Sequence, residues 1–570
     1  MHIPSFLKRS LSSLRGGSWL TVAVGAMLLF LFPCDGYADR YVDGRVAATG
    51  TGTLESPFKT IQEAAAVATA GETVFIRAGT YRETVTPANS GTDSASQITF
   101  QPYKDEAVTI SGADVVATKW MQASGKIYST ELPDLYKSTL NQDEQVFVDG
   151  EMFTLARFPN IPAGADRLQP GEAAYLRIDT VTPKQEVKNG AKDHEWPVGN
   201  GGAVTFTFRD SALTQETGYW NDATLWIVPS QHKAWGFGAI GPVLSHTKTP
   251  EGGGEVRAMI YDGTESFFHF HPGETRYYLF NTKACLDAPG EWWLDKATRR
   301  LFVWTPQGDS PASHTVEVKR RDYAFDLTDR SYITIKGIQT FAATITTDRD
   351  LGNGAGHGAW VSGNRGGYGL PQGAPGAHHI TLDGIKARYV SHFEGTTGHL
   401  HSQWINSSGI ALSGSHHVLQ NSSIAYSAGN GVVVFGDNHL IRNNIIHDVA
   451  YSAPLASGIY IAQIADNSKG TKILPMDFEI ANNTLFRSGW GLIDGSNLFS
   501  SDKSKPSRIH HNFIDGAGLM TRDVGGVRFV GHRDNPPLVN GTRIDHNFVR
   551  NVTSYLGNAL YLDFNDGYVA

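Results

Sequence analysis

The chain has 570 residues, of which 40% are hydrophobic and 18% are charged, and it contains 62 glycines. This length allows more than one domain, and the glycine content suits a fold with many turns rather than a disordered chain. The net charge of -8 leaves no basic surface that would collect phosphates, which argues against nucleic acid as a partner.

Residues 1–38 have the pattern of an export signal. Basic residues precede an apolar run from Trp19 to Phe32, and small residues at 36–38 offer a cleavage site. The run is shorter than the ~20 apolar residues of a spanning helix, so we expect no stable membrane insertion once the signal is removed. The mature protein is expected to be secreted or periplasmic, in a bacterium, and to retain only Cys285, without an intramolecular disulfide.

Residues 39–114 predict an N-terminal cap followed by the first coils of a β-structure. A helix is expected to start at Ser56 or Pro57, because Ile61, Ala64 and Ala68 then share one face. Strands such as 73–76 and 108–111 follow it. A helix placed before stacked strands closes the open end of a solenoid.

Four runs in this segment carry a family resemblance: Gly52-Thr53-Leu54, Ser56-Pro57-Phe58-Lys59-Thr60-Ile61-Gln62, Gly71-Glu72-Thr73-Val74 and Gly79-Thr80-Tyr81-Arg82-Glu83. They resemble the opening of secreted right-handed parallel β-helix proteins, a superfamily with many polysaccharide lyases and glycoside hydrolases. The opening is also similar to that of bacterial β-helix xylosidases, in which a β-sandwich is inserted after the first coils. The resemblance implies a parallel β-helix that acts on carbohydrate.

Residues 115–320 differ from the rest of the chain in composition. Eight of the twelve tryptophans lie here, among short alternating runs such as 145–148 and 203–208. Many short strands separated by Gly, Pro and Asp predict an inserted β-sandwich-like domain. We expect most of its aromatic side chains to pack in the core rather than to stack on sugars.

Residues 321–570 are expected to form an all-β fold, a right-handed parallel β-helix, because two short phrases repeat from Ser408 onward. The first phrase is a small residue followed by apolar, variable and apolar residues, at 409–412, 431–434, 458–461, 491–494, 526–529 and 559–562. Circuits of ~22 to 35 residues with a period of two are typical of a β-solenoid with at least two strands in each coil. The second phrase ends in Asn444, Asn483, Asn512 and Asn547, which we expect to form a structural ladder.

Aligning the small residues places one variable residue of each coil on an outward column. Its members would be Val433, Tyr460, Ile493, Arg528 and Tyr561. Asp494 would then point inward, either as a bulge or as a buried carboxylate of raised pKa. Long loops on one side of such a scaffold are where catalytic groups are expected.

These considerations select the candidate site residues. The candidates for catalysis are His447, Asp448, Tyr460, Asp523, Arg528 and Asp563, and those for sugar binding are Trp360, Arg522, His532, Tyr561 and Asp566. Trp360 belongs to the glycine-rich segment 348–376, which could form one wall of a cleft.

Two reactions fit this set of side chains. A glycosidase needs two carboxylates separated by roughly 5 to 9.5 Å, and it requires no cofactor for hydrolysis. A lyase acting on a uronic acid needs a base and a cation that neutralises the substrate carboxylate, a task that Ca²⁺ held by aspartates could share. A uronan epimerase would use the same groups as the lyase. The sequence contains no paired-His metal motif.

The sequence therefore predicts an exported enzyme that cleaves a polysaccharide or oligosaccharide, by hydrolysis or by β-elimination. The alternative is a non-catalytic adhesin or glycan-binding β-helix, which would have short loops and no converging polar groups. We expect a monomer.

The last repeat strand ends seven residues before the end of the sequence, and because solenoids normally end in a cap, this predicts a β-helix truncated at its C-terminus.

Overall fold

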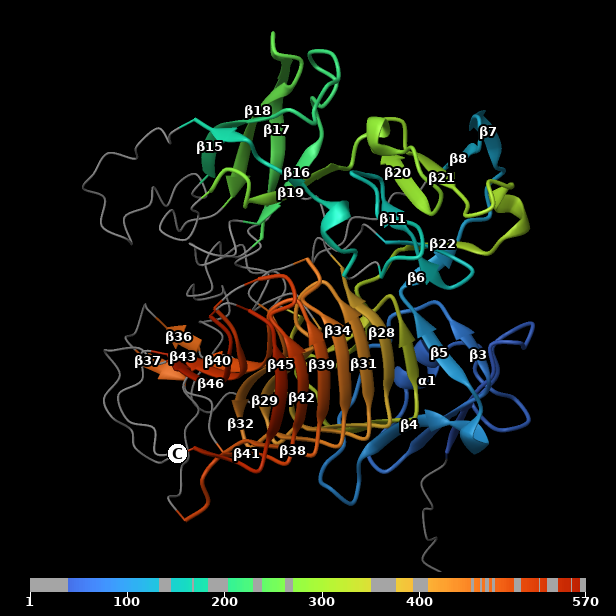
Figure 1. Cartoon of the computed structure of the whole chain (residues 1–570). Helices are drawn as coiled ribbons and strands as arrows, with labels where there is room; N and C mark the ends of the chain where they lie inside the picture. The colour runs from blue at the N-terminus through green and yellow to red at the C-terminus, as the bar shows by residue number, and fades with distance from the viewer. Residues whose placement is uncertain are drawn as a thin grey trace, which may run out of the picture. The chain divides into compact units, whose positions relative to one another are not determined.

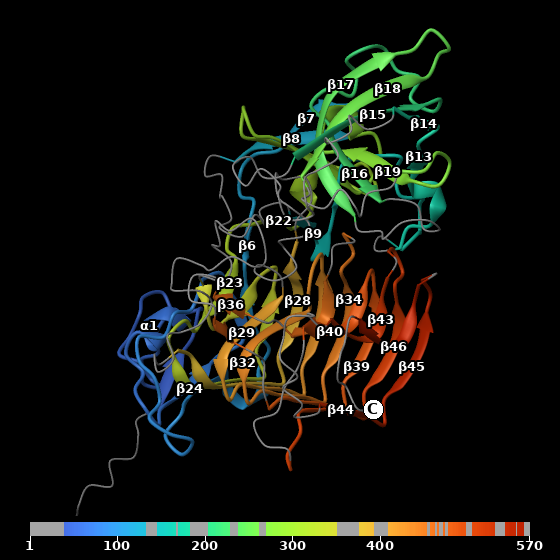
Figure 2. The same ribbon diagram turned by 90° about the vertical axis from the view of Figure 1, so that its left-hand side faces the viewer.

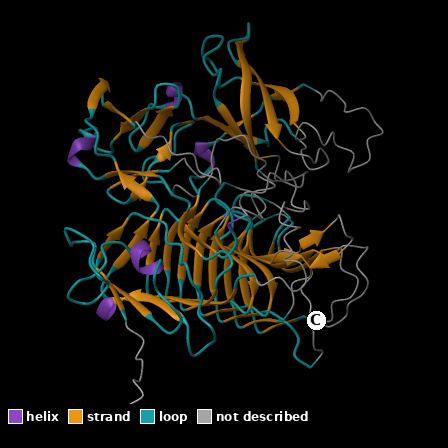
Figure 3. Cartoon of the chain, turned by 180° about the vertical axis from the view of Figure 1, so that it is seen from behind, coloured by secondary structure: helices purple, strands orange, loops and turns teal. Residues whose placement is uncertain are grey.

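The computed structural model describes residues 39–132, 145–166, 169–182, 203–228, 238–261, 270–349, 376–392, 409–452, 456–461, 464–466, 471–473, 477–496, 504–521, 523–530, 542–554 and 556–563. Strands make up most of the regular structure in these residues, and the helices are short (Figure 3). Within these ranges, no helix is long and apolar enough to cross a membrane.

The chain forms a parallel β-helix whose coils have three strands, and therefore three faces. The first face consists of β23 (Tyr323–Asp326), β26 (Thr344–Thr346), β29 (Ile410–Ser415), β32 (Val432–Asp437), β35 (Ser457–Ile461), β40 (Gly491–Ser496), β43 (Gly525–Val530) and β46 (Asn558–Asp563). The second face consists of β1 (Arg40–Val42), β2 (Thr73–Ile76), β4 (Ile98–Pro102), β24 (Ser331–Lys336), β27 (His378–Asp383), β30 (Val418–Gln420), β33 (Leu440–Arg442), β38 (Glu479–Ala481), β41 (Arg508–His510) and β44 (Arg543–Asp545).

The third face is a separate sheet of nine described strands, several of which lie side by side in Figure 1. They are β3 (Gly79–Tyr81), β5 (Val108–Ser111), β25 (Gln339–Phe341), β28 (Lys386–Ser391), β31 (Ser423–Ser427), β34 (Ile445–Val449), β39 (Thr484–Ser488), β42 (Phe513–Ala517) and β45 (Phe548–Val552). A short antiparallel pair, β36 (Ile464–Asp466) and β37 (Thr471–Ile473), lies in the chain between β35 of the first face and β38 of the second face.

The hydrophobic core runs along the axis of the β-helix as columns of stacked side chains. Ile410, Val432, Ile459, Ile493 and Val527 pair from coil to coil on the first face, and all are buried. Burial of such side chains stabilises the fold by about 1.5–3 kcal/mol each. The fold class predicted from the repeats is therefore observed.

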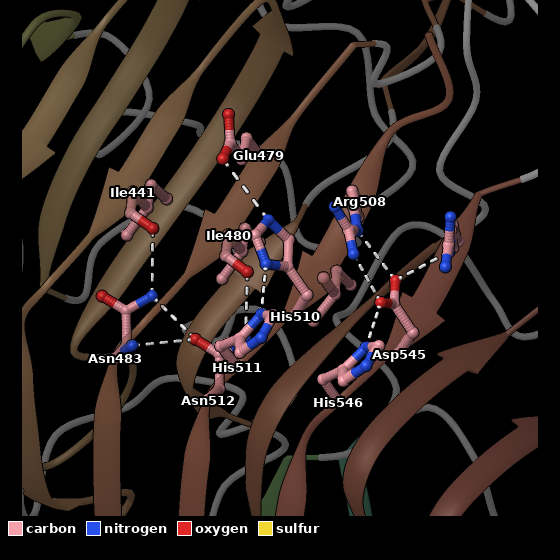
Figure 4. A network of polar contacts seen from close by, with 12 residues as sticks. Ile441, Glu479, Ile480, Asn483, Arg508, His510, His511, Asn512, Asp545 and His546 are labelled. Atoms are coloured by element: carbon pink, nitrogen blue, oxygen red, sulfur yellow. Dashed lines mark hydrogen bonds and ion pairs between the residues drawn. The ribbon is translucent and has the colours of Figure 1, made fainter. Parts of the chain in front are cut away.

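The predicted asparagine ladder lies at the turn between the second and third faces. The Nδ2 of Asn483 donates to Oδ1 of Asn512 and to the carbonyl of Ile441, each at 3.0 Å. Asn512 donates in the same way to the Ile480 carbonyl (Figure 4) and to the side chain of Asn547. The ladder satisfies backbone groups that the turn would leave unpaired, which confirms its structural role.

Residues before the first long coils form the cap. Helix α1 (Ile61–Ala65) starts at Ile61 rather than at Ser56 or Pro57, because Thr60 and Glu63 form a reciprocal capping box. Its apolar face is buried against the end of the core. The other helices in the part of the chain that the structure describes are short 3₁₀ turns: η1 (Tyr103–Asp105), η2 (Glu172–Ala174), η4 (Lys283–Cys285) and η5 (Pro311–Ser313).

An insertion built from three sheets begins at β6 and ends at β22 (Figure 2). One sheet contains β10 (Glu151–Met152), β9 (Val146–Val148), β22 (Val316–Lys319) and β6 (Ala113–Val115). The next contains β11 (Thr154–Leu155), β20 (Glu291–Asp295), β21 (Arg300–Trp304), β8 (Ile127–Glu131) and β7 (Met121–Ser124). The largest contains β12 (Arg157–Phe158), β13 (Leu176–Arg177), β14 (Thr180–Val181), β15 (Ala203–Asp210), β16 (Thr224–Val228), β17 (Ala239–Lys248), β18 (Gly254–Tyr261) and β19 (Arg276–Phe280).

Aromatic side chains of the insertion serve mainly as core. Trp220, Trp226 and Trp292 are almost completely buried, as expected. Cys285 is buried and free.

Candidate functional site

An outward column on the first face brings together four polar or aromatic side chains from successive coils. Tyr460 of β35 pairs with Asp494 of β40, which pairs with Arg528 of β43, which pairs with Tyr561 of β46. Tyr460 and Arg528 are largely buried rather than exposed, at 4% and 9%. The column therefore places charged groups where water screens them little.

The expected position of Asp494 was wrong by one residue. The structure pairs Gly491 with Ser457 and Ile493 with Ile459. Superposing the repeat phrases 458–461 and 491–494 predicts instead that Gly491 pairs with Gly458. A slip of one residue moves every side chain of a strand to the opposite face. Ile493 is consequently a core residue, and Asp494 belongs to the outward column without a bulge in its pairing.

Arg528 lies between two carboxylates. Its Nη1 is 3.5 Å from Oδ2 of Asp494, and its Nη2 is 3.9 Å from Oδ2 of Asp523. The guanidinium also lies over the rings of Trp490 and Tyr561, at 4.9 and 5.4 Å from their centroids. Cation–π contacts on a partly desolvated guanidinium of this kind restrict its position.

Asp523 is held at the turn that precedes β43. Its Oδ1 accepts a hydrogen bond of 2.9 Å from the hydroxyl of Tyr561, and its backbone carbonyl accepts one of 3.2 Å from Nε1 of Trp490. The residue has a left-handed backbone, with φ of 56°, and it is 3% exposed. Three coils thus fix one carboxylate beside Arg528.

Asp494 is a buried carboxyl group whose pKa is raised to about 6. Burial is the largest cause, and it outweighs the nearby Arg528 guanidinium and the backbone N–H of Gly495, both of which lower the pKa. The negative charge of Asp523 raises the pKa further. Asp494 is therefore a buried carboxyl group of raised pKa, as predicted. The prediction that its side chain points into the core was wrong.

His447 and Asp448 belong to another face. They lie in β34 on the third face, rather than in a loop, and Nδ1 of His447 is 2.6 Å from Oδ2 of Asp448. Arg487 forms an ion pair with Asp448 at 2.7 Å and another with Asp166 of the insertion. His447 stacks on Phe486 with 4.7 Å between ring centroids. These contacts stabilise the stack and do not include the column of Asp494.

The other candidates divide between the site and the residues that the structure leaves undescribed. The structure brings Asp523, Arg528 and Tyr561 together and places Tyr460 in the same column. Asp563 is the last residue of β46, and its backbone pairs with Val530 of β43. This pair lies two residues beyond the pair of Arg528 and Tyr561. Four candidates lie outside the described residues: Trp360, Arg522, His532 and Asp566.

Sequence reasoning missed Trp490 and misplaced Asp494. Trp490 directly precedes a repeat phrase, a position that could have indicated a side chain near the first face. In the described ranges, no three His, Cys, Asp or Glu side chains are close enough to hold a metal ion.

Comparisons with known proteins agree with the fold. No protein-family model matches the chain. The uncharacterized protein YwoF of Bacillus subtilis is 44% identical over 80 residues, and the pectate lyase PEL9 of Emericella nidulans is 38% identical over 90 residues. These matches cover 14% and 15% of this chain, and 17% and 22% of the two relatives.

One solved structure resembles almost the whole chain. It is described as a glycoside hydrolase, and the alignment covers 93% of this chain and 96% of that one, with a TM-score of 0.51. The sequences are 13% identical, so the likeness shows a shared fold.

Proposed function

We propose that this protein is an exported enzyme that hydrolyses glycosidic bonds, with Asp494 as the acid and Asp523 as the second carboxylate. The observation that carries the proposal is the single guanidinium of Arg528, which lies within 3.9 Å of both carboxylates. The carboxylates are thus one guanidinium apart, which is compatible with the roughly 5 to 9.5 Å that separates such pairs in glycosidases.

The two carboxylates have different environments and hence different roles. Asp494, whose pKa is about 6, carries its proton below that pH and can donate it to the glycosidic oxygen as the C–O bond breaks. Asp523 accepts a hydrogen bond from the hydroxyl of Tyr561 and faces the guanidinium of Arg528. Both contacts favour the ionised form of Asp523. It would attack the anomeric carbon or take a proton from the attacking water.

Hydrolysis fits the surroundings of Arg528 better than elimination does. A uronate lyase needs a cation free to neutralise the carboxylate of the substrate and a base that takes the C5 proton. Arg528 already lies beside two carboxyl groups of the chain, and Asp523 compensates its charge even when Asp494 is protonated. This leaves it poorly suited to either task.

The known proteins support a carbohydrate substrate, but no particular one. The matched relative is named a pectate lyase and the structurally similar protein is named a glycoside hydrolase, and both names denote enzymes that act on carbohydrate. Export is proposed from the pattern of residues 1–38 alone.

A panel of neutral and uronic polysaccharides tests the proposal. We expect new reducing ends on at least one of them, without the ultraviolet absorbance of unsaturated uronates. Absorbance that rises in proportion to the reducing ends would establish elimination instead. Binding without either product would favour the non-catalytic glycan-binding protein.

A further inference from the structure

The second face carries a groove that is separate from the column of Asp494. It has a volume of about 410 Å³ and is bordered by strands β38 and β41 and by the turn that precedes β33. Charged and amide side chains line it: Asn438, Asp477, Glu479, Lys505, Arg508 and His510. Its volume lies within the range of roughly 300–1,000 Å³ that is usual for small-molecule sites.

Several of these side chains are held in place before any ligand binds. Asp545, on the next coil, accepts two hydrogen bonds from Arg508, at 2.8 and 2.5 Å (Figure 4). The same carboxylate is 3.0 Å from Arg543 and 2.5 Å from His546. The hydrogen bonds from Arg508 come first, and together with the hydrogen bond to His546 and the charge of Arg543 they hold the pKa of Asp545 well below its usual value, so this carboxylate remains charged.

A second fixed pair forms the other side of the groove. Nε2 of His510 is 3.3 Å from Oε1 of Glu479, and Nδ1 of His510 is 2.8 Å from Nδ1 of His511. Preorganised polar groups lose little conformational entropy on binding, which makes them effective recognition elements.

One cationic group and one further donor remain available to a ligand. Lys505 is exposed and has no ion-pair partner among the described residues. Asp545 engages Nε and Nη2 of Arg508 and compensates its charge, which leaves Nη1 as a hydrogen-bond donor. The carboxylates of Asp477 and Glu479 border the same groove and can accept hydrogen bonds from the hydroxyl groups of a ligand.

We propose that this groove is a second saccharide-binding site, which takes an oligosaccharide containing a uronic acid. The carboxylate of the sugar would form an ion pair with Lys505 and accept a hydrogen bond from Nη1 of Arg508, and its hydroxyls would donate to Asp477, Glu479 and Asn438. Lying on a different face from Asp494, the groove would hold a glycan chain on the protein without taking part in bond cleavage.

Calorimetric titration of trigalacturonate tests this site. The titration uses the full chain with Asp494→Asn, so that cleavage at the proposed active site does not consume the probe. Lys505→Ala in that background should lower the affinity at least about tenfold, because it removes a charge-assisted contact. The matched controls are Lys386→Ala and Arg442→Ala, which remove exposed basic side chains outside the groove. Both should leave the affinity unchanged.

Maltotriose, a neutral trisaccharide, should bind at least about tenfold more weakly than trigalacturonate, and salt should weaken only the binding of the acidic probe. Unchanged affinity in Lys505→Ala would overturn the site, as would equal affinity for maltotriose. Lys505 is exposed, so this variant is expected to fold even if Arg508→Ala does not.

Discussion

Asp494 shows how a buried acid can be kept near a useful pKa. Burial favours the neutral carboxyl, Arg528 favours the carboxylate, and the outcome is a pKa of about 6. Because this folded-state pKa exceeds the ordinary 3.8, the group stabilises the fold below pH 3.8 and loses that contribution as the pH rises through about 6. The protein thus keeps a destabilising carboxylate at neutral pH, which is common at functional sites.

The pH dependence of activity follows from the same group. If Asp494 is the acid, kcat/KM should decrease about tenfold for each pH unit above about 6, because the protonated form becomes scarce. Reducing-end assays between pH 4 and 9 measure this. An aryl glycoside whose leaving group needs no proton should lose the effect, and an unchanged alkaline limb with that substrate would argue against general-acid catalysis by Asp494.

The ladders at the turns are the elements that fix the stacking of the coils. Asn483 is buried, and its side chain satisfies groups on two neighbouring coils. Asn483→Ala should therefore lower the free energy of unfolding by about 1–3 kcal/mol, because these backbone groups lose their partners. Chemical denaturation measures the effect, and Asn558→Ala, at an exposed position, is the control. If both substitutions lower the free energy of unfolding by the same small amount, the ladder does not contribute to the stability of the fold.

A histidine ladder stabilises the turn between the first and second faces. Nδ1 of His417 accepts from the backbone N–H of Ile380, and Nδ1 of His439 accepts from that of His417, each at 3.2 Å. The two Nε2 atoms lie 2.9 and 2.8 Å from the carbonyls of Ser413 and Phe435, so each ring is neutral with its proton on Nε2. Burial lowers both pKa values, and that of His439 to about 4.

This ladder predicts instability in acid. Since the folded pKa of His439 lies below the ordinary 6.5, its contribution is present above pH 6.5 and is lost as the pH falls through about 4. The loss is on the order of 3 kcal/mol. Denaturation between pH 7 and 4 should show a smaller decline of stability in His439→Gln than in the wild type. Equal declines would mean that other groups cause the acid sensitivity.

At the scale of elements, sequence reasoning succeeded where a chemical pattern repeats and failed where two registers look alike. The apolar columns and the asparagine ladder follow from period and residue type, because stacking requires the same chemistry in each coil. Around Gly491 the neighbouring Trp490, Leu492 and Ile493 are all buried, so hydrophobicity alone could not distinguish the two registers. The pairing of whole strands decides between them.

At the scale of the molecule, the insertion contacts the turns that lead into the first face. Nη2 of Arg276, on β19, donates to the carbonyl of Met520 at 2.9 Å, and Nε1 of Trp226 donates to the carbonyl of Ser452 at 3.0 Å. Met520 is also part of the insertion's hydrophobic core and precedes Asp523 by three residues. The insertion therefore supports the turn that carries the second carboxylate.

Removing this support should impair catalysis more than binding. Arg276→Ala is expected to lower kcat by about tenfold to a hundredfold with little change in KM, because small displacements of a reacting group are costly. Arg177→Ala, an exposed arginine of the same sheet, is the control and should retain its activity. Equal kcat values for the two variants, measured on folded protein, would contradict a positioning role.

These contacts between distant segments could not be predicted from the sequence. The change of composition indicated the insertion, but nothing in it specifies that Arg276 meets the turn of Met520, 244 residues away. The convergence of Asp494, Asp523 and Arg528 likewise depends on three coils stacked in one exact register, with loops of different length between them.

The most direct test of the proposed function compares two aspartates of the β-helix. Asp494→Asn removes the proposed acid, whereas Asp515→Asn alters a carboxylate that pairs with Arg550 on the third face. On the polysaccharide that the wild type cleaves, kcat/KM for reducing-end release should fall by about 10² to 10⁴ in Asp494→Asn and stay within about twofold of wild type in Asp515→Asn. Comparable activity in the two folded variants would show that Asp494 is not the catalytic acid.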